Sequence, residues 1–123
     1  MMDKHPLIGI VGPCGAGKST LAANLNRLGY STRHIAQEHS YVPAMWQRIT
    51  NPDLLIFLDV SYQNTLKRRS LDWSESEYQE QIKRLQHARQ HADHYLDTNH
   101  LDQAGVFEAI LAWLKESVPP PGI

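Results

Sequence analysis

The chain has 123 residues, with 12 lysine and arginine side chains, 13 aspartate and glutamate side chains and a single cysteine. A chain of this length is expected to fold as one domain, and its near-neutral charge offers no basic surface for a nucleic-acid partner. No apolar stretch approaches the roughly 18 residues that a membrane-spanning helix needs, which argues against a membrane partner.

The two ends of the chain and its cysteine count bear on its location. Residues 1–6 lead directly into the first expected strand, so we expect no signal peptide. One cysteine cannot form an intrachain disulfide, which favours a cytoplasmic protein. Residues 1–118 are predicted to form the single domain, and the proline-rich residues 119–123 are predicted to be a flexible tail.

The first element in chain order is a strand over residues 7–11, a short apolar run that is typical of a buried strand. A helix is expected over about residues 18–28, ended by Gly29. The segment between them begins a match to the phosphate-binding pattern G-x-x-x-x-G-K-[ST]. The matching stretch and the residue after it are Gly12, Pro13, Cys14, Gly15, Ala16, Gly17, Lys18, Ser19 and Thr20.

This succession of strand, glycine-rich loop and helix predicts an anion-binding site. The backbone N–H groups of the loop and the positive end of the helix dipole point at one spot. The Lys18 ammonium group is expected to reach the β- and γ-phosphates, and the Ser19 hydroxyl is expected to be a ligand of Mg²⁺. The sequence therefore predicts that the protein binds a nucleoside triphosphate together with Mg²⁺.

Beyond residue 28, strand-like and helix-like patterns alternate. The first half of this stretch predicts a strand over 30–36, a loop over 37–40, a helix over 42–50, a strand over 54–58 closed by Asp59, and a helix from Ser61 to about residue 70. The strand over 54–58 has five apolar residues in a row, so we expect it to be buried on both faces.

The second half begins with a capping box, in which Ser74 and Glu77 open the longest expected helix. Its apolar face is expected to carry Tyr78, Ile82, Leu85, Ala88 and Ala92. A short strand over 95–98 and a last helix over about 102–117 complete the chain. The inward residues of that last helix are expected to be Val106, Phe107, Ile110, Leu111, Trp113 and Leu114.

Strands that alternate with helices predict an α/β fold of the P-loop NTPase type. We expect a three-layer sandwich, in which a small parallel sheet of about four strands is flanked by helices on both faces. In such sheets the ligand lies outside the carboxyl ends of the strands, which is where the glycine-rich loop is also expected.

Beyond the loop, three stretches make the chain resemble the P-loop kinases, the family of nucleoside, nucleotide and small-metabolite kinases. Residues 52–61 and the helix after them are similar to the segment that leads into the family's arginine-bearing lid. The helix over 77–91 resembles the far side of that lid, and residues 95–98 resemble the final strand before the loop that cradles adenine. The resemblance implies ATP and Mg²⁺ as cofactors.

The resemblance also bears on the acceptor. In typical nucleotide kinases a helical insert between the first helix and the acidic strand end grips the acceptor nucleotide. Here only residues 29–36 separate the first helix from Glu38, so that insert is missing. The acceptor is then expected to be a small molecule, or another macromolecule, or there is none.

Phosphoryl transfer needs charge neutralisation and a group that orients the nucleophile. Lys18 supplies one cation, and the resemblance implies Arg68 and Arg84 as lid arginines. Glu38 and Asp59 are the two strand-end carboxylates that qualify as a ligand of Mg²⁺. The family pattern favours Glu38, which is also the candidate for the catalytic base.

Other functions remain as alternatives. The chain is interpreted as a kinase or an ATPase, or else as a non-catalytic, nucleotide-binding regulatory module. A GTPase is less favoured, because His100 replaces the lysine of the guanine-reading N-K-x-D pattern at residues 99–102. The sequence leaves open whether the protein is a monomer or a homodimer.

Two further groups of residues have alternative interpretations. His87, His91 and His94 fall on roughly one helical face with zinc-pair spacing, although a polar, exposed stripe is the favoured interpretation. Cys14 lies near a helix N-terminus, which allows redox control of nucleotide binding as an alternative to a space-filling role.

Overall fold

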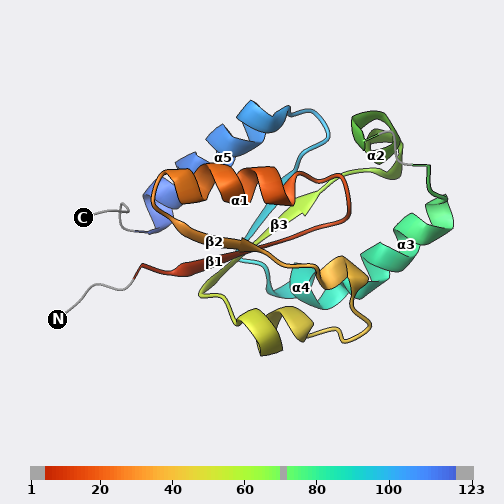
Figure 1. Cartoon of the computed structure of the whole chain (residues 1–123), viewed down its shortest axis with the longest axis horizontal. Helices are drawn as coiled ribbons and strands as arrows, with labels where there is room; N and C mark the ends of the chain where they lie inside the picture. The colour runs from red at the N-terminus through yellow and green to blue at the C-terminus, as the bar shows by residue number, and fades with distance from the viewer. Residues whose placement is uncertain (1–4, 70–71, 119–123) are drawn as a thin grey trace.

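The computed structural model describes residues 5–69 and 72–118 (Figure 1), so the tail predicted over 119–123 lies outside the described residues. Strands alternate with helices along the chain, as predicted. The elements are β1 (Leu7–Val11), α1 (Lys18–Arg27), β2 (Ser31–His34), the 3-10 turn η1 (Gln37–His39), the π-helical turn η2 (Trp46–Thr50), β3 (Leu54–Asp59), α2 (Tyr62–Arg69), α3 (Glu75–Arg84), α4 (Gln86–His91), β4 (His94–Asp97) and α5 (Gln103–Ser117).

The four strands form one parallel sheet in the order β2-β1-β3-β4. β1 and β3 lie at the centre and are almost entirely buried, which explains their continuous apolar sequences. The chain passes from β1 to β2 on one side and then returns to β3 on the other side. The strand order therefore reverses between β1 and β3, and a crevice is expected beyond their carboxyl ends.

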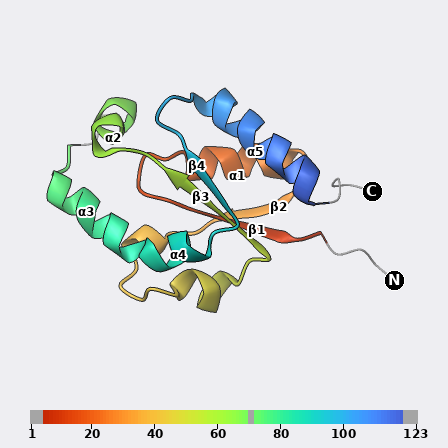
Figure 2. The same ribbon diagram turned by 180° about the vertical axis from the view of Figure 1, so that it is seen from behind.

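Helices cover both faces of the sheet, which confirms the predicted three-layer arrangement (Figures 1 and 2). On one face, α1 and α5 bury a core that includes Leu25 and Ile110 against Ile56 of β3. On the other face, η2 and α4 pack on alternate residues of the same strand, among them Phe57. Because side chains alternate across a strand, β3 contributes to both cores.

The longest predicted helix is divided in two at Leu85. The Leu85 N–H bonds to the carbonyls of Gln81 and Ile82, and the Leu85 side chain is buried in the second core. The Arg84 carbonyl accepts a hydrogen bond of 3.2 Å from the Gln37 side chain of η1. A tertiary contact at this point thus competes with continuation of the helix, and α4 begins at Gln86.

The helix predicted over 42–50 is also shorter than expected. The Trp46 N–H donates to the Gln37 side-chain oxygen at 2.9 Å, so this amide is bonded outside the helix. The turn η2 then closes with Asn51 in the left-handed region, at φ 47°. Among residues 5–69 and 72–118, every helix is too short or too polar to cross a bilayer.

Candidate active site

The glycine-rich loop joins the end of β1 to the start of α1, as the motif predicts. Gly12 approaches the β3 backbone so closely that an added Cβ would lie 2.2 Å from the Leu58 carbonyl oxygen. Gly17 adopts φ 93° immediately before the helix, a conformation that side chains other than glycine rarely take. These glycines bring the loop backbone over the carboxyl end of the sheet and turn it into α1.

Lys18 is folded back into the loop. Its Nζ donates to the carbonyl oxygens of Gly12 at 2.7 Å and Pro13 at 3.2 Å. The same atom lies 2.9 Å from Oε2 of Glu38, and Lys18 is only 8% exposed. The predicted phosphate-binding cation is therefore paired within the protein, beside the predicted carboxylate.

Glu38 reaches this position because η1 is anchored on both sides. Gln37 is fully buried and donates to the carbonyls of Val42 and Arg84, which holds the turn against α3. Glu38 is 4% exposed, and its Oε1 is buried without a hydrogen-bond partner. An orphaned carboxylate oxygen at this depth is costly, and a bound cation or a hydrogen-bond donor would satisfy it.

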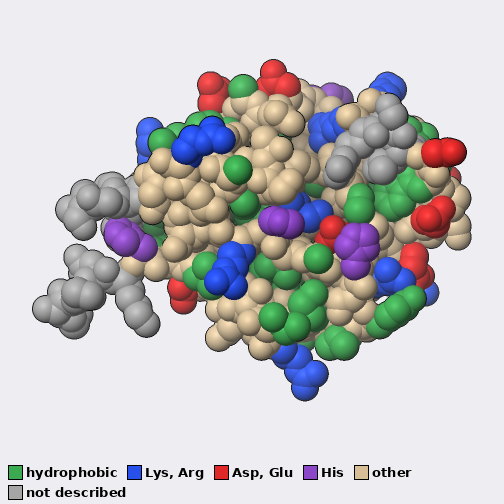
Figure 3. Space-filling model, in the orientation of Figure 1, with side chains coloured by type: hydrophobic (Ala, Val, Ile, Leu, Met, Phe, Trp, Pro, Cys, Tyr) green, Lys and Arg blue, Asp and Glu red, His purple; other side chains and the backbone are tan. Residues whose placement is uncertain are grey.

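A cavity of about 740 Å³ opens along the loop, within the range of about 300–1,000 Å³ that is usual for ligand pockets. On the face of the molecule drawn in Figure 3, histidine side chains lie near the middle, with basic and acidic side chains close to them. The cavity is lined by Cys14, Gly15, Ala16, Gly17, Lys18, Ser19, Thr20, Leu21, His34, Glu38, His39, Arg68, Leu101, Asp102, Gln103 and Val106.

Arg68, which belongs to α2, lines the cavity. Its guanidinium donates to the Gly15 carbonyl at 3.4 Å, to Thr98 Oγ1 at 2.9 Å and to the Leu101 carbonyl at 3.3 Å, and also contacts the Thr98 carbonyl. Arg68 thus ties the glycine-rich loop to the segment after β4. This is the segment that the resemblance to kinases predicts to hold adenine.

Arg84 and Asp59 do not line the cavity, in contrast to Glu38. The Arg84 guanidinium lies 4.2 Å from the centre of the Tyr41 ring, and its Nη1 donates to the Glu38 carbonyl at 3.3 Å. The Asp59 carboxylate accepts hydrogen bonds from the Val60 N–H and the Tyr95 hydroxyl. In this conformation, Arg84 supports η1 and Asp59 closes the end of β3.

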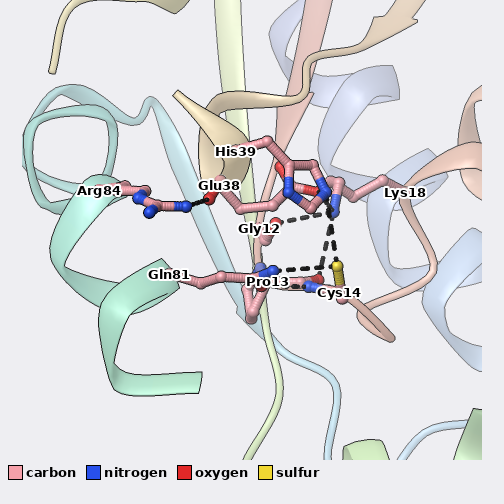
Figure 4. A network of polar contacts seen from close by, with 8 residues as sticks. All are labelled: Gly12, Pro13, Cys14, Lys18, Glu38, His39, Gln81 and Arg84. Carbon is pink, nitrogen blue, oxygen red and sulfur yellow. Dashed lines mark hydrogen bonds and ion pairs between the residues drawn. The ribbon is translucent and has the colours of Figure 1, made fainter. Parts of the chain in front are cut away.

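Sequence reasoning missed Gln81, which contacts the loop from α3 (Figure 4). Its Oε1 accepts from the Cys14 N–H at 3.0 Å, and its Nε2 lies 3.2 Å from the Cys14 sulfur. Gln81 falls between Tyr78 and Leu85 on the buried side of the helix, and this polar residue within an apolar face was the available signal. The contact spans 67 positions in the sequence, so no local pattern indicates its partner.

The histidines with zinc-pair spacing are used elsewhere. His87 Nδ1 lies 3.0 Å from Trp46 Nε1, which donates to it, and His94 stacks on Trp113. Within the part of the chain that the structure describes, the cluster of three potential metal ligands consists of Cys14, Glu38 and His39. His94 lies on β4 and not on the helix, so the three histidines do not share one helical face. His87 and His94 are half-buried against tryptophans, so they do not form the exposed stripe that the sequence favours either.

Of the comparisons with known proteins, the one with solved structures agrees with this architecture. No protein-family model matches the chain, and no curated protein sequence matches it. Among solved structures, it is similar to the shikimate kinase from Acinetobacter baumannii in complex with shikimate, with a TM-score of 0.60 and 16% sequence identity. The match covers 93% of this chain and 96% of that chain. The chain therefore has the fold of a small P-loop kinase, as predicted.

Proposed function

We propose that this protein binds ATP with Mg²⁺ and transfers the γ-phosphoryl group to a small acceptor. The observation that carries the proposal is the cavity in which Lys18, Ser19 and Glu38 meet at the glycine-rich loop. A P-loop kinase fold supports the class of reaction. ATP and the roles of individual residues are inferred from the chemistry of the lining.

The phosphates would be bound by the amides of the loop and the start of α1. Lys18 would leave the carbonyls of Gly12 and Pro13 and pair with the β- and γ-phosphates. Its departure from Glu38 would leave a carboxylate beside the terminal phosphate, ready to orient the nucleophile. Arg68 would position the segment from Thr98 to Leu101, and the adenine ring of ATP would lie against this segment.

The residues at the loop fit Mg²⁺. Ser19 lines the cavity and carries a hydroxyl group, and Glu38 has a buried oxygen without a partner. Oxygen ligands of this kind, completed by water and phosphate, are what Mg²⁺ takes in nucleotide sites. The ion would neutralise phosphate charge when bound. Asp59 does not meet this test, because its carboxylate is bonded to Tyr95 and Val60.

The acceptor is proposed to be a small molecule. The connection between α1 and η1 is short and consists mainly of β2, which leaves little chain to enclose a second nucleotide. The similar kinase structure is also a complex with a small molecule, shikimate. A small hydroxyl-bearing acceptor is therefore the substrate class to screen first.

A panel of ATP, GTP and their diphosphates, with and without Mg²⁺, tests the proposal by thermal shift and by turnover. A ligand present at about 100 times its dissociation constant adds about 2.7 kcal/mol to stability. Lys18→Ala should abolish the shift with ATP while the fold, checked by circular dichroism, stays intact. Unchanged affinity in this variant would contradict the proposed site.

A second candidate is a nucleotide-binding module without catalysis. The observation that favours it is the position of Arg84, which contacts Tyr41 and η1 and does not line the cavity. Tight ATP binding without turnover on any small acceptor would support this module. A GTPase is the least supported, because Asp102 caps α5 by accepting from the Gly105 N–H at 2.8 Å.

A further inference from the structure

Cys14, Glu38 and His39 bring three metal-ligating groups together at one end of the cavity. The Cys14 sulfur lies 3.8 Å from His39 Nε2, and His39 Nε2 lies 3.7 Å from Glu38 Oε2. One ligand atom from each residue falls within 4.8 Å of the other two. The three side chains come from the glycine-rich loop and from η1, which lie side by side in Figure 4.

The chemistry of this group differs from that of a magnesium site. A thiolate, an imidazole and a carboxylate suit borderline divalent metals such as Zn²⁺, whereas Mg²⁺ takes oxygen ligands. A tetrahedral zinc ion with ordinary bond lengths separates its sulfur and nitrogen ligands by about 3.5 Å. Two of the three separations, 3.8 Å and 3.7 Å, therefore need to shrink by only a few tenths of an ångström. The third, between Cys14 and Glu38, lies within 4.8 Å and closes by a rotation of the exposed end of the site.

Two independent features make the cluster receptive to a cation. Glu38 Oε1 is buried without a hydrogen-bond partner, so the carboxylate has unused capacity as a ligand. Gln81 bonds to both the N–H and the sulfur of Cys14, which holds this side chain toward the cluster. The His39 side chain is 60% exposed, so the group is accessible from solvent.

We propose that Cys14, Glu38 and His39 bind Zn²⁺ or a similar transition metal, with a fourth position open to water, and that the bound metal inhibits the enzyme. Binding ionises the Cys14 thiol, and its proton leaves to solvent. The inhibition rests on the proposed function, because the metal occupies the same Glu38 carboxylate that phosphoryl transfer uses. Zinc binding itself does not depend on that function.

Lys18 sets the strength of this site. Its ammonium group lies 2.9 Å from Glu38 Oε2, and it opposes a second cation at the same carboxylate. Removing this charge is expected to strengthen metal binding by about tenfold, while triphosphate binding is lost. Lys18→Met therefore separates the metal site from the phosphate site.

The test uses the full, tag-free chain, titrated with Co²⁺ and then with Zn²⁺. Co²⁺ should give a thiolate charge-transfer band, and one equivalent of Zn²⁺ should abolish it. Cys14→Ser and His39→Gln should weaken metal binding by at least about 100-fold. The matched control is His34→Gln, which removes another histidine of the cavity wall and should bind as the wild type does.

The outcomes separate the two proposals. If Co²⁺ gives no charge-transfer band, or if His34→Gln weakens binding as much as His39→Gln, the metal site is refuted whatever the turnover. Wild-type turnover should fall at least about tenfold with one equivalent of Zn²⁺ and recover with a chelator. The turnover of Cys14→Ser, whatever its value without metal, should not change when the same amount of Zn²⁺ is added. If zinc binds without inhibiting a measurable turnover, the regulatory part is refuted. Metal binding without any ATP binding would refute the proposed function alone.

Discussion

The Lys18 ammonium group lies 2.9 Å from Oε2 of Glu38, and both side chains are less than one-tenth exposed. An ion pair at this depth is only weakly screened by solvent. Before a triphosphate can bind to Lys18, the lysine must therefore give up its contact with the carboxylate. Glu38 therefore has two opposite effects. It weakens triphosphate binding because it competes with the phosphates for Lys18, and it promotes phosphoryl transfer because it orients the nucleophile.

Glu38→Gln should separate these effects. Glutamine has nearly the same size but no charge, so Lys18 is more readily available to the phosphates. In the absence of Mg²⁺ we expect ATP to bind at least as tightly as in the wild type, while phosphoryl transfer or hydrolysis with Mg²⁺ falls by about 100-fold or more. Calorimetric titration measures the affinity, and a coupled assay measures the rate.

Asp59→Asn is the matched carboxylate control for this experiment. Because Asp59 bonds to Val60 and Tyr95 and does not line the cavity, its substitution should change turnover by less than about threefold. The opposite pattern, in which Asp59→Asn stops the reaction and Glu38→Gln preserves it, would overturn the assignment of the carboxylate.

Gly12→Ala should be far more damaging than Gly17→Ala. The new methyl group at Gly12 would lie 2.2 Å from the Leu58 carbonyl oxygen, and neither strand can move away without disturbing the sheet. We expect a loss of about 3 kcal/mol or more in the free energy of unfolding. At Gly17 no atom lies within 4 Å of the added Cβ, so only the left-handed backbone strain remains, about 1 kcal/mol.

Urea unfolding of the two variants measures this difference directly. Equal losses of stability would mean that the close approach of Gly12 to β3 is not a packing constraint. The nucleotide affinity of both variants is measured as well, because both residues belong to the phosphate-binding motif.

The glycine-rich loop and the strands could be predicted because their signals are local. The loop from Gly12 to Thr20 is one continuous pattern, and the apolar run of β3 is unambiguous. The division of a long helix at Leu85 could not be predicted, because it follows from a bond between the Arg84 carbonyl and Gln37, 47 positions away. A helical periodicity contains no information about such a contact.

The same distinction separates the site residues. Glu38 and Asp59 both follow strands that pair with β1, so strand position alone makes both of them candidates. The resemblance to P-loop kinases favours Glu38, and Glu38 lines the cavity whereas Asp59 does not. Whether Arg84 points into the cavity or toward Tyr41 depends on the rotation of α3 about its axis. That rotation is set by packing against η1, which the sequence spacing does not specify.

Arg68→Ala tests whether this arginine holds the site together or acts on the transferred phosphoryl group. Its bonds to Gly15, Thr98 and Leu101 predict a loss of about 1.5 kcal/mol in stability together with weaker nucleotide binding. Arg68→Lys should not restore either property, because one ammonium group cannot span these acceptors. A fall in kcat with unchanged stability and KM would instead support the lid role.

Tyr95 provides a test at alkaline pH. Burial, and then the hydrogen bond to Asp59 and its charge, raise the pKa of Tyr95 to about 12. In the unfolded chain, tyrosine loses its proton near a pKa of about 10. The folded state therefore holds this proton more tightly, and the resulting stability is complete below about pH 10 and is lost as the pH rises through about 12.

Urea unfolding from about pH 9 to about pH 12 should accordingly show a decline in stability that Tyr95→Phe reduces. The effect should be smaller than the roughly 2.7 kcal/mol that two pKa units represent, because Tyr95 is 42% exposed and solvent screens its partner. Tyr41→Phe is the control, since it removes a tyrosine that is 81% exposed. If wild type and Tyr95→Phe lose stability in parallel across this range, the bond between Tyr95 and Asp59 does not contribute to folding.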